Sequence, residues 1–408
     1  MEKVVIVGGG ISGIIAAIKA KNNNEVIILE RNNTCGKKIL VTGNGKCNYT
    51  NSNQDLSNYH SSNPELIEKI INEFNLNEMH DMLKNFGIIP KIKNGYYYPY
   101  SNQAVTFKNA LLQELENKDI IVKTDTYVTN IEYLENKFII ETNKEKIIAD
   151  KVVLATGGSA SPKLGSDGNG YLLLKKLGHS IIEPLPALVG LKTKENISLI
   201  SGCRNDVKLK LYENNKFIKE EIGEIQFNDN GISGICTMQL SSTIARGLYD
   251  NKKEVIFINF VPTIGNTKEE ILNFINNQDK IVLNRNISEL LDNMLNYKIT
   301  NYLLKKLKLD INLKWSNLKQ IEKENIVDNL INFKLEIIDT NSFINAQTTS
   351  GGVPLVELDL KTMESLKIKN LYIIGELVDV DGVCGGYNIT FALITGLIAG
   401  KNIGGNNA

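Results

Sequence analysis

The sequence lacks the paired cysteines typical of small secreted proteins and the runs of like charge typical of nucleic-acid-binding proteins. Its 408 residues include five cysteines and no C-x-x-C pair, and this odd, scattered set argues against a disulfide framework. The 46 basic and 46 acidic side chains cancel, and no run of five like charges occurs. We therefore expect neither a nucleic-acid partner nor a charged membrane surface as partner.

Long apolar runs and targeting signals are missing as well. The longest weakly polar run, residues 389–400, is too short for a bilayer, which takes about 20 apolar residues to span. The apolar start, residues 4–7, lacks the basic region and cleavage site of a signal peptide. No metal-ligand spacing is present. We expect a cytoplasmic protein that acts on a small molecule, with no membrane partner and no metal, and the sequence gives no indication of an oligomeric state.

The length and the pattern of apolar residues predict more than one domain. A chain of 408 residues exceeds the size at which one core keeps growing. Short strands are expected over residues 120–154, alternating strands over residues 188–262, and helices over residues 267–328. Glycine motifs occur near both ends of the chain. The pattern therefore favours a cofactor domain assembled from both ends, with a large insertion between them.

The first thirty residues read as a strand, a glycine turn, a helix and a second strand. Gly8, Gly10 and Gly13 satisfy G-x-G-x-x-G at the helix start, where backbone N–H groups can approach a pyrophosphate. Glu30 ends the second strand, where a carboxylate can accept hydrogen bonds from ribose hydroxyls and would repel a 2′-phosphate. FAD or NAD is therefore expected rather than NADP. The alternative is a structural glycine turn with a fortuitous acid.

A second glycine-rich segment near the C-terminus favours FAD over NAD. A strand over residues 371–374 ends at Gly375 and Glu376, and a turn leads from there into an apolar helix. The turn comprises Gly385, Gly386, Tyr387 and Asn388. Such a helix start can direct backbone N–H groups at the flavin carbonyl and stabilise the negative charge of a reduced ring. The alternative is a strand, turn and helix that only complete the sheet.

Residues 41–51, VTGNGKCNYTN, form a third candidate segment. Their small residues and glycines predict an irregular loop that can lie against a flat ring, although a solvated basic loop is the alternative. Cys47 has no partner cysteine nearby in the sequence, so a redox thiol is not expected. The three histidines are expected to be structural. The tyrosines of residues 96–100 are expected to form a half-buried strand, and the alternative is that they line a substrate pocket and offer a phenol as acid. The sequence identifies no catalytic residue.

Six motifs resemble a bacterial family of NAD(P)/FAD-dependent oxidoreductases, the HI0933-like or aminoacetone-oxidase-like flavoproteins. They are GGGISG, GKKILVTGNGKCNYTN, GYYYPYSNQA, SDGNGY, TTSGGVPLVELDLKTMES and GELVDVDGVCGGYNITFA, and they span nearly the whole chain. The resemblance implies an α/β fold with a glutathione-reductase-like Rossmann FAD domain formed by residues 1–187 and 347–408. It also implies a β-barrel-like insert, residues 188–265 and 329–346, and a helical subdomain, residues 266–328.

Together with the patterns above, the resemblance implies a set of contacts to non-covalent FAD. These are Gly8, Gly10, Ser12, Gly13, Glu30, Arg31, Lys38, Thr42, Gly43, Asn44, Gly45, Val128, Ala155, Thr156, Gly157, Gly158, Gly375, Glu376, Gly385, Gly386, Tyr387 and Asn388. Two positions depart from the family pattern: Thr390 stands where Gln is common, and Lys46 stands where Arg is common. A role of those two positions in substrate binding is therefore in doubt.

The activity implied by the resemblance is an FAD-dependent oxidoreductase. Hydride would pass from NAD(P)H through the flavin to an organic substrate, an unsaturated ring or steroid-like compound, or to oxygen. The family includes proteins that reduce unsaturated bile-acid rings and others described as amine oxidases. Residues 188–345 contain no second G-x-G-x-x-G, so NAD(P)H is expected to bind transiently. The alternative is a flavin-binding redox sensor or RNA-modification partner with little turnover.

Overall fold

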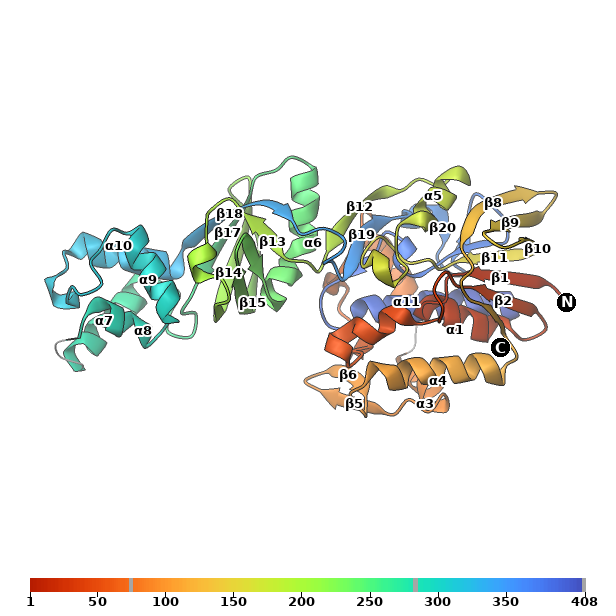
Figure 1. The fold of residues 1–408 in the computed structure, drawn as a ribbon, viewed down its shortest axis with the longest axis horizontal. Coiled ribbons are helices and arrows are strands. Elements are labelled where there is room, and N and C mark those ends of the chain that lie inside the picture. Colours follow the sequence, from red (N-terminus) through yellow and green to blue (C-terminus); the bar gives the residue numbers. More distant parts are fainter. Residues whose placement is uncertain (73–75, 282–284, 406–408) are drawn as a thin grey trace. The chain divides into compact units, whose positions relative to one another are not determined.

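The chain divides into two compact units (Figure 1). The computed structural model describes residues 1–72, 76–281 and 285–405. Unit 1 comprises Met1–Ala187 and Ala346–Ala408, and unit 2 comprises Leu188–Asn345. Both ends of the chain therefore build unit 1, and unit 2 is inserted between them. The last three residues of the predicted cofactor domain, 406–408, lie outside the described residues.

A mixed sheet of seven strands is the centre of unit 1, as far as the chain is described. Its order is β20-β21-β22-β11-β1-β2-β7, and the strands from β22 to β7 pair in parallel. Their bounds are β1 Lys3–Val7, β2 Glu25–Leu29, β7 Ile121–Lys123, β11 Lys151–Leu154, β20 Leu358–Asp359, β21 Glu364–Ser365 and β22 Leu371–Ile373. The central strands are continuous apolar runs because helices and loops cover both faces of the sheet. The sequence of β1, KVVIV, is buried from its second residue onward.

Two helices from opposite ends of the chain pack against each other beside this sheet. They are α1 (Ile11–Ala20) and α11 (Tyr387–Gly404). Gly396 and Gly400 allow the close approach, because a Cβ atom at Gly396 would lie 2.5 Å from the backbone oxygen of Ser12. A Cβ atom at Gly400 would lie 2.7 Å from the backbone oxygen of Ala16. The N-terminal and C-terminal segments are thus joined through backbone contacts that larger residues would prevent.

Shorter elements complete unit 1. Its other helices are α2 (Pro64–Asn72), α3 (Leu76–Asn85), α4 (Ala104–Asn117) and α5 (Asn169–Lys176), and the 3₁₀ segment η1 covers Lys37–Gly45. Two small sheets have three strands each: one contains β8 (Val128–Leu134), β9 (Lys137–Thr142) and β10 (Lys146–Ala149), and the other contains β3 (Thr50–Asn51), β5 (Pro90–Lys93) and β6 (Tyr96–Pro99). Two further sheets have two strands each. One pairs β4 (Tyr59–His60) with β23 (Asp381–Gly382), and the other pairs β12 (Ile182–Ala187) with β19 (Thr348–Gly352). The β8–β10 meander agrees with the strands expected over residues 120–154.

Unit 2 is a closed barrel followed by helices. The barrel order is β13-β16-β15-β14-β17-β18. The barrel strands are β13 Leu191–Thr193, β14 Arg204–Glu213, β15 Lys216–Asn228, β16 Gly231–Ser233, β17 Glu254–Asn259 and β18 Phe333–Thr340. The helices of this unit are α6 Ile235–Tyr249, α7 Lys268–Ile281, α8 Ile287–Asp292, α9 Tyr297–Lys306 and α10 Gln320–Ile331. Alternate residues of β14, Val207, Leu209 and Leu211, are fully buried, as expected when one strand face points into a barrel.

The predicted fold class, a Rossmann-type α/β domain with a barrel-like insert and helical parts, is confirmed. The helices over residues 268–331 share one hydrophobic core with the barrel strands, so they belong to unit 2 rather than to a third unit. No described helix combines the length and the apolar character needed to cross a membrane.

Candidate functional site

A cavity in unit 1 lies where β1, β2 and β11 end. Its empty volume is about 1280 Å³, part of it open to solvent. The lining comes from segments at both ends of the chain: the loop and helix after β1, the loop after β2, η1, residues 126–128 and 155–169, and the first turn of α11. In open parallel sheets ligands bind outside the carboxyl ends of the strands, so this position is the expected one for a cofactor.

The glycine turn after β1 lines this cavity with Gly8, Gly9 and Gly10, and only Gly10 of these has open space for a side chain. Gly8 has φ +108°, and a Cβ atom there would lie 2.4 Å from the backbone oxygen of Ala155. A Cβ atom at Gly13 would lie 2.0 Å from the backbone oxygen of Gly8. Gly10 differs, because nothing within 4 Å would meet a Cβ atom built on it. Gly10 is also the N-cap of α1 and makes no side-chain cap, so the helix start is free to receive an anion.

Glu30 lies at the end of β2 with only 7% of its surface exposed. Its Oε2 accepts a hydrogen bond from the Gly9 backbone N–H at 2.8 Å, and its Oε1 accepts one from the Asn32 N–H at 2.8 Å. These two backbone donors fix the carboxylate on the cavity wall next to the glycine turn. A ribose diol can therefore be bound beside a pyrophosphate held at α1, and these residues fit the adenosine diphosphate part of FAD.

A cluster of polar and aromatic side chains lies around Arg31 at the cavity wall. The Arg31 guanidinium is ion-paired with Asp167 and lies 4.9 Å from the centre of the Tyr127 ring. The Asn169 side-chain amide donates to the backbone oxygen of Val128 at 3.0 Å. The arrangement is suited to a flat heterocycle, because Tyr127 offers a ring face and Val128 an apolar side chain.

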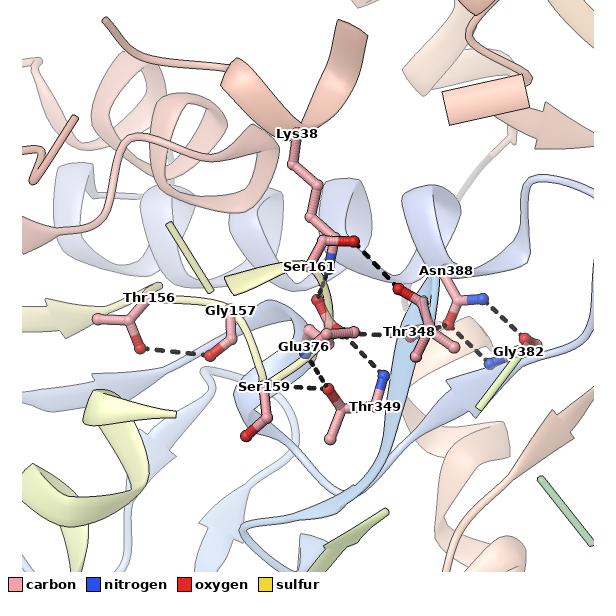
Figure 2. A network of polar contacts seen from close by, with 12 residues as sticks. Lys38, Thr156, Gly157, Ser159, Ser161, Thr348, Thr349, Glu376, Gly382 and Asn388 are labelled. Carbon is pink, nitrogen blue, oxygen red and sulfur yellow. Dashed lines mark hydrogen bonds and ion pairs between the residues drawn. The ribbon is translucent and has the colours of Figure 1, made fainter. Parts of the chain in front are cut away.

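A second polar network lies on the α11 side of the cavity (Figure 2). Lys38 extends from η1 and its Nζ lies 2.7 Å from Oε2 of Glu376. The other oxygen of Glu376 accepts the Thr349 backbone N–H at 2.9 Å. Asn388, in the first turn of α11, bonds both backbone groups of Gly382: its Oδ1 accepts at 2.8 Å and its Nδ2 donates at 2.7 Å. The start of α11 is therefore anchored to β23 while it faces the cavity.

The structure brings most of the predicted site residues to this cavity. Those that line it are Gly8, Gly10, Ser12, Glu30, Arg31, Lys38, Thr42, Val128, Ala155, Thr156, Gly157, Glu376 and Asn388. Those that do not are Gly13, Gly43, Asn44, Gly45, Gly158, Gly375, Gly385, Gly386 and Tyr387. Gly386 is the N-cap of α11, and a Cβ atom on it would lie 2.8 Å from the Thr50 backbone nitrogen. This glycine packs against β3, and the cofactor contacts assigned to the second set stay predictions.

Several lining residues were not expected from the sequence. They are Gly9, Asn32, Tyr127, Asp167, Asn169, Thr348, Ile389, Phe391 and Ala392, among others. Asp167 and Asn169 belong to the SDGNGY motif, which was a signal that could have identified them. The apolar residues at the start of α11 looked like ordinary helix core, and periodicity cannot distinguish a side chain that faces a core from one that faces a cavity.

Four of the five thiols, those of Cys35, Cys47, Cys203 and Cys236, are buried, and two of the histidines are packed within the fold. Burial raises the pKa of the Cys47 thiol to about 12, so it is not a thiolate at neutral pH. His179 is buried, with Nδ1 2.7 Å from Oε2 of Glu357 and Nε2 2.9 Å from Oγ of Ser365. His80 stacks on Tyr97 with 4.6 Å between the ring centres. None of these groups lines the cavity described above.

Comparisons with known proteins identify the same kind of fold over the whole chain. The family described as HI0933-like protein Rossmann domain matches residues 2–402. The 3-dehydro-bile acid delta(4,6)-reductase of Clostridium scindens is 37% identical over 405 residues, which cover 98% of each chain. The ribosomal RNA dihydrouridine synthase of Escherichia coli is 26% identical over 398 residues, 95% of this chain and 94% of that one.

One similar solved structure is the 3-ketosteroid-delta4-(5alpha)-dehydrogenase of Rhodococcus jostii RHA1 in complex with 4-androstene-3,17-dione. The match covers 99% of this chain and 97% of that chain, at 13% sequence identity and a TM-score of 0.48. The match over residues 2–402, together with the 37% identity to a full-length relative, shows that the chain belongs to the HI0933-like family of Rossmann-type flavoprotein oxidoreductases.

Proposed function

We propose that this protein is an FAD-dependent reductase that uses NAD(P)H to saturate a ring C=C bond conjugated to a carbonyl group in a steroid-sized substrate. The observation that carries the proposal is the cavity itself. It is lined by the Glu30 carboxylate, by an uncapped helix start at Gly10 and by the first turn of α11. A diol site, an anion site and a second helix start correspond to the ribose, the pyrophosphate and the flavin ring of an extended FAD.

The chain's own residues then have distinct tasks. The first turn of α1 binds the pyrophosphate, and Glu30 accepts from the ribose hydroxyls. The N–H groups at the start of α11 stabilise negative charge on a reduced ring. FAD, when bound, supplies a ring that takes a hydride from a nicotinamide and passes it to an acceptor. No described segment repeats the first glycine turn in unit 2, and we therefore propose that NAD(P)H binds transiently.

The relatives support the choice of reaction. The name of the first describes reduction at the 4 and 6 double bonds of a bile acid, and dihydrouridine is uridine whose ring double bond has been saturated. Both reactions add hydrogen to an electron-poor ring C=C bond. The present chain is more similar to the bile-acid enzyme, at 37% against 26% identity. Its balanced charge also suits a small organic acid better than ribosomal RNA.

The test is a pair of half-reactions under anaerobic conditions. The purified protein is titrated with NADH and with NADPH, and the bleaching of the flavin spectrum is followed. The reduced protein is then mixed with 3-oxo-4,6-choladienoic acid, and the steroid is analysed by mass spectrometry. We expect the flavin spectrum to return and the steroid to gain two or four hydrogens. A reduced protein that is reoxidised by oxygen but not by the dienone would contradict the proposal.

A second candidate is reduction of uridine in ribosomal RNA, which the 26% identity over 95% of this chain favours. A ribosomal RNA transcript replaces the steroid in the same experiment, and dihydrouridine is measured after nuclease digestion. Formation of dihydrouridine without any steroid product would place the protein with that relative instead.

A further inference from the structure

His60 and Asp381 form a pair on two short strands of unit 1. His60 ends β4 and Asp381 begins β23, and the two residues are paired in the antiparallel register. The distance from Nδ1 of His60 to Oδ2 of Asp381 is 3.3 Å. The Asp381 side chain is 2% exposed, whereas the His60 side chain is 29% exposed. The carboxylate can only accept, so Nδ1 donates to it and Nε2 points away from it.

This pair lies beside the α11 side of the cavity. Val380, the residue before β23, lines the cavity. Gly382, the residue after Asp381, is held through both backbone groups by Asn388, which also lines the cavity. β23 therefore connects two parts of the cavity wall, and consecutive Cα atoms are about 3.8 Å apart. The imidazole is one strand away from the wall at the same side as the start of α11.

The position of His60 is fixed from several directions. Beyond β4, the Ser62 backbone N–H donates to Oδ2 of Asp379 at 2.8 Å. Asp379 is 3% exposed and precedes β23 by two residues. The two strands are thus joined by their ladder, by the His60–Asp381 pair and by the Asp379 contact. A group held in this way can deliver a proton with a fixed direction.

Reduction of a conjugated C=C bond needs a proton as well as a hydride. Two charged side chains of the cavity wall are engaged elsewhere: Lys38 is ion-paired with Glu376, and Glu30 accepts two backbone N–H groups. A histidine is the side-chain type that most often serves as a general acid, and a carboxylate on Nδ1 fixes the orientation of its ring. The His60–Asp381 pair can supply the proton that the proposed reaction needs.

We propose that His60 is the proton donor for the saturated ring carbon and that Asp381 is its positioning residue, an inference that rests on the proposed function. A hydride adds to the β-carbon, and the electron pair of the C=C bond moves toward the carbonyl group. The Nε2–H bond of protonated His60 breaks, and its proton goes to the α-carbon. The imidazole then regains a proton from water. The substrate gains two hydrogens, and NAD(P)H is oxidised to NAD(P)⁺.

The surroundings of His60 set the expected pH dependence. Asp381 faces the ring from β23, and Asp379 is the next carboxylate on the same segment. Tyr387 of α11 lies across β4, and Glu65 of α2 is exposed. Because Nδ1 donates to Asp381, a neutral imidazole has no proton to give from Nε2. The rate of substrate reduction should therefore decrease once the ring has lost its Nε2 proton.

The test compares His60→Gln with His179→Asn in the FAD-loaded full-length chain. His179 is a matched control, because it is also paired with a carboxylate but its side chain is fully buried. We expect His60→Gln to lower the rate of flavin reoxidation by 3-oxo-4,6-choladienoic acid by about 10²-fold or more. FAD content and reduction by NAD(P)H should stay at the wild-type level. His179→Asn should leave the pH profile of reoxidation unchanged.

Two further measurements separate proton donation from a structural effect. Imidazole added to His60→Ala should restore part of the reoxidation rate, and His60→Gln should lose the decrease of that rate at high pH. Asp381→Asn, which keeps the size of the side chain but changes the acceptor of the Nδ1–H group, should lower the reoxidation rate while FAD content stays at the wild-type level. If the wild type reduces the dienone and His60→Gln does so equally fast with the same pH profile, the inference is wrong. If the wild type reduces neither the dienone nor RNA, the proposed function fails first.

Discussion

The buried carboxylate of Glu254 offers a quantitative test of the barrel. Glu254 begins β17, is fully buried, and has no hydrogen-bond partner for either oxygen among the described residues. It is paired in register with Glu213 of β14. Both carboxylates pack beneath α6, since a Cβ atom on Gly247 would lie 1.9 Å from Oε1 of Glu254 and 3.1 Å from Oε2 of Glu213. Burial, followed by the charge of Glu213, raises the pKa of Glu254 to about 7.

The consequence for stability follows from the direction of this shift. Below pH 4.5 Glu254 is protonated in the folded and the unfolded chain, and it imposes no penalty. Between pH 4.5 and about 7 the unfolded chain releases the proton that the folded chain retains, so the free energy of unfolding falls. A difference of roughly 2.5 pKa units corresponds to about 3 kcal/mol. Above pH 7 Glu254 is ionised in the folded and the unfolded chain, and the free energy of unfolding remains lower by this full amount.

Glu254→Gln keeps the size of the side chain and removes the titration. We expect the variant to unfold at about the same urea concentration as the wild type at pH 4.5, and to be more stable by about 3 kcal/mol at pH 8. Fluorescence of Trp315 reports on the right unit, because it is the only tryptophan of the chain and is buried in the core of unit 2. Glu224→Gln, on the barrel surface, should show no such pH-dependent gain. A stability difference for Glu254→Gln that is equal at pH 4.5 and pH 8 would refute the reasoning.

Three further predictions concern the cofactor. Gly10→Val should lower FAD affinity at least tenfold, because the new side chain would enter the space expected for the pyrophosphate. The fold should be kept, because the φ of −76° suits any residue and the Cβ atom would enter only open space. Retention of full FAD after gel filtration would count against a pyrophosphate at this turn. Glu30→Ala should weaken FAD binding by about 1–3 kcal/mol in a fluorescence titration, and an unchanged affinity would mean that another group binds the ribose. Gly386→Val should displace the start of α11 from Thr50 and lower the FAD occupancy or the reduction potential of the flavin. If both values are unaltered, the start of α11 does not contact the flavin.

The parts of the site that were predictable from the sequence are local. Gly8, Gly10 and Glu30 lie in one strand–helix–strand unit, so their spacing alone places them on one wall of the cavity. The opposite wall depends on distant segments. Tyr127 and Asp167 meet around Arg31 only because three separate loops end at the same edge of the sheet. No short-range pattern contains that information.

The fold shows the same division between local and distant pairing. Alternating residues predicted strands over residues 188–262, but closure of the barrel needs β13 to pair with β18, far along the chain. Pro184 and Pro186 lie in β12, which pairs with β19 and ends at Ala187, the last residue before unit 2 begins. The two-stranded ladder has a free edge that tolerates residues without an N–H group.

The contact of Gly396 and Gly400 with α1 also fixes the order of events during synthesis of the protein. The helix α1, which follows the first glycine turn, is translated long before its partner α11. At about 5–20 residues per second, the interval is roughly 20 to 80 s. Throughout that interval the nascent Rossmann unit lacks β22 and α11, while the barrel, whose strands are contiguous within the insertion, can already close. A cavity lined by both α1 and α11 can therefore form only after α11 has been made.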